Sequence, residues 1–528
     1  MAHGAALEKR SRLMASVGSN PTLSGGRGAG VVYQARLESA CRLWRPWVRI
    51  PPSPLALTAS PPGGLCIRIQ LCDNISANAD MARAKQSKET GECPQMRISF
   101  VEPRAPFCNF YSSVIGHLPM LGPIYLATIL KRDGHDIRMY NENAKKLDYA
   151  AIKDSDVLGI SIMTATAPRG YEIAQAFRSL NPKGRIIIGG CHATFMSEEA
   201  LQYADHVVTG EGELVISDLV RYGGEKIVQG KPVEDLDELP FPDFSLMFGA
   251  ERPLITSMST SRGCPNDCNF CSVSPMFGRK YRIRSAESVL QELSRFKHRH
   301  VFFCDDNFGV NRHVTKELLN LMIEHGITPR WTAQTGVNIA KDDEMLELMK
   351  RTGCRRLCIG FESMDADTLK SYGKKQTPED VKNCIRVLHK HGIKVHGMFI
   401  SEGYSDIYDR LGIDTLQLTI LTPIIGSRLH RAVKEAGQFL TQIYPRDWKL
   451  FDGTHVVHWP DGMSPLEMQR QTVRAMKKFY SRINMMKMLI KGRYRDYCIR
   501  HEGRRLINKW EKQNKDYLLW LKRGLVQG

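Results

Sequence analysis

The stretch "SRGCPNDCNFCSVSP", residues 261–275, places Cys264, Cys268 and Cys271 within eight positions among turn-forming residues. A structural zinc site would need four ligands in paired spacings, so three clustered thiolates do not fit one. A [4Fe–4S] cluster is normally held by four cysteines, and three would leave one iron open for chemistry. The spacing C-x3-C-x2-C therefore indicates an iron–sulfur cluster with a free coordination position.

Six strand-like runs begin just before this motif and are separated by helical stretches. They cover residues 254–260, 300–308, 330–338, 356–363, 394–403 and 414–423. Strands that alternate with helices are typical of a parallel sheet, because each helix carries the chain back to the start of the next strand. Functional side chains are expected where these strands end.

The three-cysteine spacing, with the aromatic Phe270 directly before the last cysteine, resembles the signature of the radical SAM superfamily. This resemblance implies a partial (βα)6 TIM-like barrel over residues 251–425, with its site at the carboxyl ends of the strands. It also implies that Cys264, Cys268 and Cys271 hold a [4Fe–4S] cluster whose open iron chelates S-adenosylmethionine. One electron from the cluster would then cleave the sulfonium and yield a 5′-deoxyadenosyl radical.

Polar residues at the ends of three barrel strands match cofactor-binding positions of the superfamily. The run "CDDNF" at the second strand would bind the ammonium group of S-adenosylmethionine, and "GFES" at the fourth resembles the pair that hydrogen-bonds its ribose. A glutamine that ends the third strand is a further candidate. Without the resemblance, carboxylates at strand ends would be expected to cap helices. The candidate residues are Asp305, Asp306, Asn307, Gln334, Glu362 and Ser363.

Residues 96–230 show a second alternation of strands and helices, with short apolar runs such as "DVLGISIM" and "GRIIIGG". This pattern predicts a Rossmann-like, doubly wound parallel sheet, whose ligands bind beyond the carboxyl ends of the strands. The segments "GGCHATF" (189–195) and "GEGE" (210–213) each follow a predicted strand. Both resemble the cobalamin-binding domain that precedes the barrel in many radical SAM enzymes.

That resemblance implies that glycines let the backbone approach the corrin ring while small polar side chains line it. The D-x-H-x-x-G motif, whose histidine ligates cobalt in other cobalamin proteins, is missing. Either cobalamin binds without a protein ligand to cobalt, or the domain is vestigial. For the histidine of "GGCHATF", the alternative role is to cap a backbone group of its loop. The implied lining residues are Thr164, Thr166, Gly189, Gly190, His192, Gly210 and Glu211.

The net charge of +18 lies at the two ends of the chain. Residues 1–95 carry 12 Lys and Arg against 6 Asp and Glu, and residues 464–528 carry 17 against 5. Residues 96–463 are balanced, with 45 of each sign. A neutral body argues against a dedicated nucleic-acid partner.

Residues 1–95 show neither a strand nor a helix period and are rich in Gly, Ser, Pro and Arg. We expect a disordered or spurious N-terminal extension. If it is spurious, Met81 or Met96 is the true start, and "VGSNPT" and "WVRIPP" are translated from the T-arm consensus of transfer-RNA genes. The first residues also lack the apolar core of a secretory signal.

Residues 231–250 are expected to be an ordered linker, and residues 426–528 a helical, basic C-terminal extension. The helices of this extension carry aromatic and apolar faces among lysines and arginines, so they either cap the barrel or contact an anionic membrane surface. No apolar run reaches about 18 residues, so no transmembrane helix is expected. Fourteen scattered cysteines favour reduced thiols and a cytoplasmic location.

Together, the two resemblances imply a cobalamin-dependent radical S-adenosylmethionine enzyme that methylates an unactivated carbon through methylcobalamin. The alternative enzyme is a cobalamin-dependent radical cyclase or rearrangement oxidoreductase, as in the anaerobic magnesium-protoporphyrin ester cyclase. The non-catalytic alternative is a remnant, because only residues 402–413 connect the last two barrel strands and a deletion there would expose both. Expected partners are a small-molecule, lipid or tetrapyrrole substrate and a reductant such as flavodoxin or ferredoxin.

Overall fold

A computed structural model describes most of the chain beyond its N-terminal region. The described residues are 94–106, 118–248, 255–296, 300–403 and 407–524. They all belong to one compact unit, Ala79–Gly528. The predictions for residues 1–93, including the start at Met81, lie outside the described residues.

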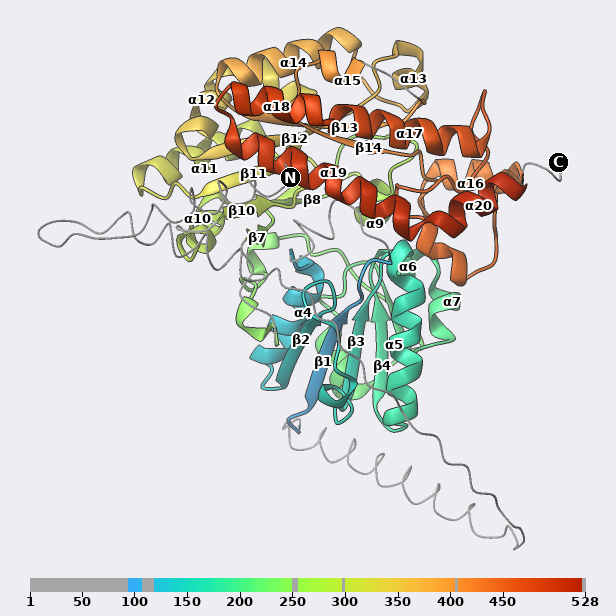
Figure 1. The fold of residues 1–528 in the computed structure, drawn as a ribbon. Coiled ribbons are helices and arrows are strands. Elements are labelled where there is room, and N and C mark those ends of the chain that lie inside the picture. Colours follow the sequence, from blue (N-terminus) through green and yellow to red (C-terminus); the bar gives the residue numbers. More distant parts are fainter. Residues whose placement is uncertain (1–93, 107–117, 249–254, 297–299, 404–406, 525–528) are drawn as a thin grey trace, which may run out of the picture. The chain divides into compact units, whose positions relative to one another are not determined.

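The first half of this unit is a six-stranded parallel sheet (Figure 1). Its spatial order is β2-β1-β3-β4-β5-β6, so the direction of winding reverses between β1 and β3. The strands are β1 (Arg97–Glu102), β2 (Asp136–Asn141), β3 (Val157–Ser161), β4 (Arg185–Gly189), β5 (His206–Thr209) and β6 (Ile227–Gln229). The helices are α4 (Leu121–Arg132), α5 (Ala167–Leu180), α6 (Cys191–Phe195), α7 (Ser197–Leu201) and α8 (Ile216–Tyr222). The predicted doubly wound fold is confirmed.

Apolar side chains cover both faces of this sheet, as a sheet wrapped by helices requires. One cluster joins Leu158 and Ile188 to Phe177 on α5. The other joins Ile98 and Val208 to residues of α4 and α8. Because the strands are buried on both sides, they appear in the sequence as continuous apolar runs.

The second half is a parallel sheet whose six strands stand in sequence order, as in a partial barrel. The strands are β7 (Ile255–Met258), β10 (His300–Phe303), β11 (Arg330–Thr335), β12 (Cys354–Glu362), β13 (Lys394–Ile400) and β14 (Thr415–Thr419). The helices between them are α10 (Ala286–Ser294), α11 (Arg312–Glu324), α12 (Asp343–Arg351), α13 (Ala366–Ser371) and α14 (Pro378–Lys390). The prediction of six strands separated by helices is confirmed.

In the crossover between β13 and β14, the described residues form one helix, the one-turn α15 (Ile407–Arg410). The two strands nevertheless pair in parallel, from His396 opposite Thr415 to Ile400 opposite Thr419. The short crossover therefore does not prevent the sixth strand from joining the barrel sheet.

Helices from the end of the chain cover the edge that the short crossover was expected to expose, so that expectation is wrong. The buried Tyr480 hydroxyl donates to the carbonyl of Leu416 in β14 at 2.7 Å and accepts from its amide at 3.0 Å. Phe479, Tyr480 and Ile507 belong to the same hydrophobic core as the barrel strands. The C-terminal helices are α16 (Arg428–Glu435), α17 (Pro465–Phe479), α18 (Arg482–Ile490), α19 (Tyr494–Gln513) and α20 (Lys515–Gly524).

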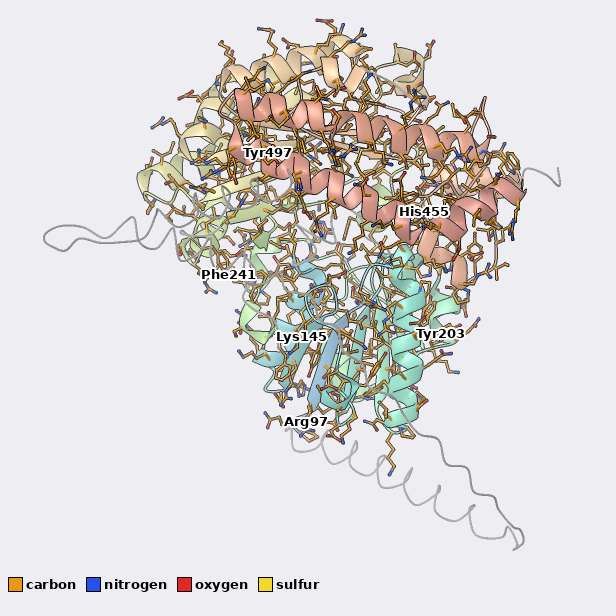
Figure 2. The ribbon with its side chains drawn as sticks, viewed as in Figure 1. Arg97, Lys145, Tyr203, Phe241, His455 and Tyr497 are labelled. Atoms are coloured by element: carbon orange, nitrogen blue, oxygen red, sulfur yellow. The ribbon has the colours of Figure 1, made fainter. Side chains whose placement is uncertain are left out.

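Polar contacts tie these helices to the loop after the barrel. Figure 2 labels the buried His455, whose Nε2 lies 2.8 Å from Asn514 Oδ1 between α19 and α20. Trp510 of α19 donates to Thr454 Oγ1 at 2.9 Å. Among the described helices, none combines the length and the apolar character needed to cross a membrane.

Candidate functional site

A two-stranded antiparallel ribbon closes the loop that carries the three cysteines. Its strands are β8 (Ser261–Arg262) and β9 (Arg282–Ile283), with Arg262 opposite Arg282. Between them lies the short helix α9 (Val273–Phe277). Gly263 has a φ of +84°, and a Cβ there would meet the carbonyl oxygen of Lys280 at 2.6 Å. The tight approach of the two ends of the loop therefore requires glycine at this position.

The three cysteines are free, half-buried thiols. Cys271 Sγ accepts the Val273 amide at 3.4 Å, and Asn307 Nδ2 lies 4.0 Å from Cys264 Sγ. Burial raises the pKa of Cys268 above its ordinary value and that of Cys271 to about 11. These two thiols therefore keep their protons until a cation replaces them, as expected of metal ligands before loading.

In the described part of the chain, no three His, Cys, Asp or Glu side chains converge on a single-ion site. A [4Fe–4S] cluster takes one thiolate per iron, so its ligands need not meet at one point. The thiol chemistry and the shared loop of Cys264, Cys268 and Cys271 fit such a cluster.

The acidic run after β10 separates into three different roles. Asp305 is buried and accepts from the Thr260 amide at 3.1 Å, from the Thr260 hydroxyl at 2.7 Å and from the Ser261 hydroxyl. Its carboxylate holds the start of β8, which differs from its predicted contact with S-adenosylmethionine. Asn307 Oδ1 accepts the Gly336 amide at 3.0 Å.

Asp306 lines a mainly apolar cavity that it shares with residues of the first sheet. Burial, followed by the neighbouring charge of Asp305, raises the pKa of Asp306 to about 6. At neutral pH this carboxyl is therefore still mostly ionised, and it can attract a cationic group.

The residues predicted at the end of β12 are engaged with their own loop. Glu362 has a φ of +64°, and its Oε1 lies 2.8 Å from Lys374 Nζ. Ser363 is buried and accepts the Asp365 amide at 2.8 Å, a local contact in the turn before α13. Gln334 is half-buried in β11.

Sequence reasoning missed Lys374, which belongs to no motif. Its ammonium group would also attract the thiolate forms of Cys268 and Cys271, and it lies 6.0 Å from the Phe270 ring centroid. Cys268, Asn307 and Lys374 open onto a polar cavity of about 630 Å³ at the carboxyl ends of the barrel strands. Only the fold shows that Lys374 lies beside the cysteines, because it belongs to the segment after β12, about a hundred residues further along the chain.

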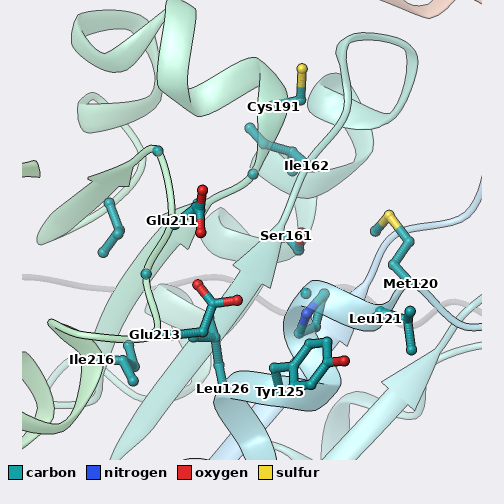
Figure 3. Close-up of a pocket in the computed structure, with 18 of the residues that line it drawn as sticks. Met120, Leu121, Tyr125, Leu126, Ser161, Ile162, Cys191, Glu211, Glu213 and Ile216 are labelled. Atoms are coloured by element: carbon teal, nitrogen blue, oxygen red, sulfur yellow. The ribbon is translucent and has the colours of Figure 1, made fainter. Parts of the chain in front are cut away.

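A second cavity, of about 420 Å³, lies between the strand ends of the first sheet and the barrel (Figure 3). Gly189, Gly190 and Gly210 line it from the first sheet, and Cys304 and Asp306 line it from the barrel. The remaining wall is mainly apolar; its members include Leu121, Leu126, Ile162, Met163, Ile187 and Ile216.

Gly190 shows why glycine is needed in this wall. Its φ is +100°, and a Cβ there would meet the carbonyl oxygen of Ile162 at 2.7 Å. The backbone of the segment after β4 can therefore form the cavity wall directly. None of the described residues that line this cavity is a histidine, which agrees with the missing D-x-H-x-x-G motif. An apolar cavity with a glycine-lined wall fits cobalamin bound without a protein ligand to cobalt.

Three of the predicted lining residues lie elsewhere. His192 is fully buried, with its Nε2 3.1 Å from Glu199 Oε1 and its ring 5.4 Å from that of Trp448. Thr164 and Thr166 are buried in a turn that packs against residues 446–450. Their predicted contact with cobalamin is therefore corrected, because the C-terminal segment occupies their surroundings.

Glu211 reaches the cavity wall, but its carboxylate is paired with arginines. Glu211 Oε2 lies 2.7 Å from Arg262 Nη1, and the same carboxylate pairs with Arg282. Glu213 Oε1 lies 2.5 Å from Arg262 Nη2. The "GEGE" segment thus contacts the two strands that flank the cysteine loop. Glu211 lines the cavity as expected, and its contact with the cofactor stays a prediction.

Comparison with known proteins gives two family matches. Residues 258–409 match the radical SAM superfamily, and residues 112–220 match the B12 binding domain. An uncharacterized methyltransferase of Pyrococcus horikoshii is 30% identical over 382 residues, which cover 63% of this chain and 82% of that protein. The bacteriochlorophyllide d C-12(1)-methyltransferase of Chlorobaculum tepidum is 26% identical over 361 residues, or 63% of this chain and 76% of that protein.

A solved structure shares the fold. The radical S-adenosylmethionine methyltransferase TsrM of Kitasatospora setae, with cobalamin and a [4Fe–4S] cluster bound, superposes with a TM-score of 0.55. The alignment covers 73% of this chain and 89% of that one at 14% identity.

Proposed function

This chain belongs to the radical SAM superfamily and carries a B12-binding domain ahead of its barrel, and from that premise we propose that it methylates an unactivated carbon of an apolar small molecule. The observation that carries the proposal is the cavity of about 420 Å³, whose wall is shared by both domains. Gly190 and Gly210 contribute one side, and Cys304 and Asp306 contribute the other. Cobalamin bound against the glycine side would face the barrel, and a substrate would meet it on the side of Cys304 and Asp306.

In this proposal, Cys264, Cys268 and Cys271 hold the cluster, and the backbone at Gly189, Gly190 and Gly210 approaches the corrin ring. When bound, the cluster supplies the electron that cleaves S-adenosylmethionine, and cobalamin supplies the methyl group. The cofactors are thus a [4Fe–4S] cluster, S-adenosylmethionine and cobalamin, which match the two domains of the chain.

The chain's own groups bind, orient and exclude water. Asp306, ionised above its pKa of about 6, attracts the cationic end of S-adenosylmethionine. The Asn307 amide orients Cys264 through its Nδ2, because its Oδ1 is fixed by the Gly336 amide. The mainly apolar wall keeps water from a reactive radical site.

The wall also indicates the class of substrate. Apolar residues from both halves line the cavity, and Arg262 is neutralised by Glu211 and Glu213. A lipid or tetrapyrrole with a large apolar body fits this lining better than a highly charged metabolite.

We expect the chain to contact membranes that carry such a substrate through α18. Ile483, Met486 and Ile490 are 71%, 51% and 82% exposed at helical spacing. Lys487 and Lys491 accompany them, so the face combines apolar anchors with positive charge. Sedimentation with vesicles containing anionic lipid should capture the protein, and Ile490→Glu should weaken that capture.

We also expect an acidic electron donor to dock beside the cysteine loop. Arg279 and Arg428 are 63% and 52% exposed, and Lys375 is exposed at the rim of the cavity that Cys268 lines. Positive groups around the site would steer a flavodoxin or ferredoxin toward it. With such a donor, S-adenosylmethionine cleavage should slow as salt rises, whereas a small chemical reductant should show a weaker dependence.

The non-catalytic alternative depended on a crippled barrel. Because β13 and β14 pair and α17 packs against β14, the short crossover gives no reason to expect a disrupted barrel. No observation favours the cyclase or rearrangement alternative over methyl transfer.

The test uses the full chain with reconstituted cluster, cobalamin, S-adenosylmethionine and a strong reductant under anaerobic conditions. Mass spectrometry should detect both 5′-deoxyadenosine and S-adenosylhomocysteine, and both should disappear in Cys268→Ala. Deoxyadenosine alone would favour the cyclase or rearrangement reaction. Neither product from a spectroscopically intact cluster would refute a radical SAM function.

A further inference from the structure

Four charged residues join the B12-binding domain to the cysteine loop. Glu211 and Glu213 lie in the segment after β5, whereas Arg262 and Arg282 are the paired residues of β8 and β9. Arg262 Nη1 donates to Glu211 Oε2 at 2.7 Å, and its Nη2 donates to Glu213 Oε1 at 2.5 Å. Arg282 Nη1 donates to Glu211 Oε2 at 3.0 Å, and its Nη2 donates to Glu211 Oε1.

These ion pairs are buried, whereas most ion pairs in proteins lie on the surface. The side chains of Arg282 and Glu211 are 2% and 4% exposed, and those of Arg262 and Glu213 are 14% and 5% exposed. Further contacts complete the set: the Val233 carbonyl accepts from Arg282 at 2.6 Å, and the Val233 amide donates to Glu211 at 3.2 Å. Buried charges are tolerated only when they are paired and hydrogen-bonded so fully, and such a geometry is rigid.

The two arginines of this cluster connect the cysteine loop to the B12-binding domain. Arg262 and Arg282 face each other at the two ends of the loop that contains Cys264, Cys268 and Cys271. Arg262 also lies over the ring of Tyr125 on α4, with its guanidinium carbon 5.5 Å from the ring centroid. Both ends of the cysteine loop are therefore attached to the domain that carries the glycine-lined wall.

We propose that Glu211 and Glu213 are positioning residues that hold the cysteine loop at a fixed place relative to the B12-binding domain. The inference rests on the proposed function, in which cluster and cobalamin serve one substrate. A displacement of about 1 Å in such a site can cost about 100-fold in rate. The glutamates would thus set the spacing of two cofactors that neither of them binds.

Hydrogen–deuterium exchange of the full chain without cofactors tests the attachment directly. Glu213→Gln removes one charge from the cluster, and Glu142→Gln is the matched control. Glu142 is also buried, 1% exposed, and lies 2.7 Å from Arg169, but that ion pair stays within the first domain. In Glu213→Gln, amides of residues 261–283 should exchange at least about tenfold faster than in the wild type, whereas in the control they should not. Equal exchange of this loop in wild type and Glu213→Gln would overturn the proposal.

Electron paramagnetic resonance of the loaded protein tests the spacing. The reduced cluster and cob(II)alamin are both paramagnetic, and their dipolar coupling falls with the inverse cube of the distance between them. The wild type and Glu142→Gln should show one defined coupling, and Glu213→Gln should show a broader distribution. An unchanged coupling in Glu213→Gln would overturn the positioning role.

The two proposals fail in different ways. If the wild type yields no deoxyadenosine but its loop loosens in Glu213→Gln, the attachment stands and the proposed function fails. If the wild type is active and neither loop exchange nor coupling changes in the variant, the function stands and the positioning role fails.

Discussion

The two six-stranded parallel sheets of this chain differ in what their strands present at the carboxyl ends. In the first sheet, β4 ends at Gly189 and β5 is followed by Gly210, and both glycines offer backbone to a mainly apolar cavity. In the barrel sheet, Asp305 follows β10 and Glu362 ends β12, and both carboxylates are paired or hydrogen-bonded. One sheet can therefore accept a large flat ligand by close approach, whereas the other orders a loop of thiols.

The sheets also differ at their edges. The first sheet winds outward in both directions from β1 and β3, so it needs no closure. The barrel sheet runs in one direction and finishes on β14, whose backbone is met by the Tyr480 hydroxyl. We conclude that the first sheet depends on its glycines, whereas the barrel depends on side chains far along the chain.

The largest expected effect tests the closure of the barrel. Tyr480→Ala removes a fully buried ring and the edge contact of Leu416, so we expect the free energy of unfolding to fall by about 3–5 kcal/mol. Urea unfolding of the full chain would measure this. A loss below about 1 kcal/mol would show that the helices only lie against the barrel.

The next effect tests the polar interior of the barrel by pH. His396 on β13 is buried, and burial lowers its pKa from 6.5 to about 4. The unfolded chain binds a proton below pH 6.5 while the folded imidazole stays neutral, so stability should fall as pH drops from 6.5 to 4. The loss should reach about 3 kcal/mol.

Urea unfolding of the cofactor-free chain across this range measures the slope. His396→Gln should be less stable at pH 7, because the imidazole contacts Thr415 Oγ1 at 2.8 Å. It should also lack most of the pH-dependent loss between 6.5 and 4. An identical slope in the variant would assign the dependence to other groups.

A smaller effect tests the glycine wall of the first sheet. Gly190→Ala puts a Cβ 2.7 Å from the Ile162 carbonyl at a φ of +100°, and should cost about 1–3 kcal/mol. Gly134→Ala is the matched control, because Gly134 has a φ of +93° but open space around its Cβ position. Only the Gly190 variant should also lose cobalamin on gel filtration; equal retention in both would contradict the glycine wall.

The smallest effect separates the hydroxyl of Tyr480 from its ring. Tyr480→Phe keeps the packing but removes the two hydrogen bonds to Leu416, so stability should fall by about 1 kcal/mol. Amide exchange at Leu416 should rise as the edge strand loses its partner. If neither the free energy of unfolding nor the exchange at Leu416 changes, the ring of Tyr480 alone accounts for the coverage of the β14 edge.

The sequence predicted those features that depend on local pattern. Six apolar runs in the barrel and five in the first domain appeared as strands, because burial on both faces produces continuous apolar segments. The three cysteines appeared as a ligand set because they share one short loop. The strand-end position of Asp306 followed from the same pattern, and the structure places it on the cavity wall.

Features that depend on distant partners could not be predicted. His192 faces Glu199 and Trp448, and the tryptophan lies more than two hundred positions further along the chain. The charge of Glu211 is paired with Arg262 and Arg282 of the other domain, a pairing that no motif in the sequence indicates. A sequence pattern indicates which side chains are available, and the fold decides what they meet.

The dependence of the barrel on its last helices has a consequence for the order of synthesis. The first domain contains all of its own strands and core, so it can fold while the ribosome still makes the barrel. The barrel core, in contrast, includes Ile507 of α19, and β14 lacks its contact with the Tyr480 hydroxyl until that residue has been synthesised. During translation the cysteine loop is therefore made long before the barrel that supports it can close, and a late premature stop codon would leave that loop on an unfinished scaffold.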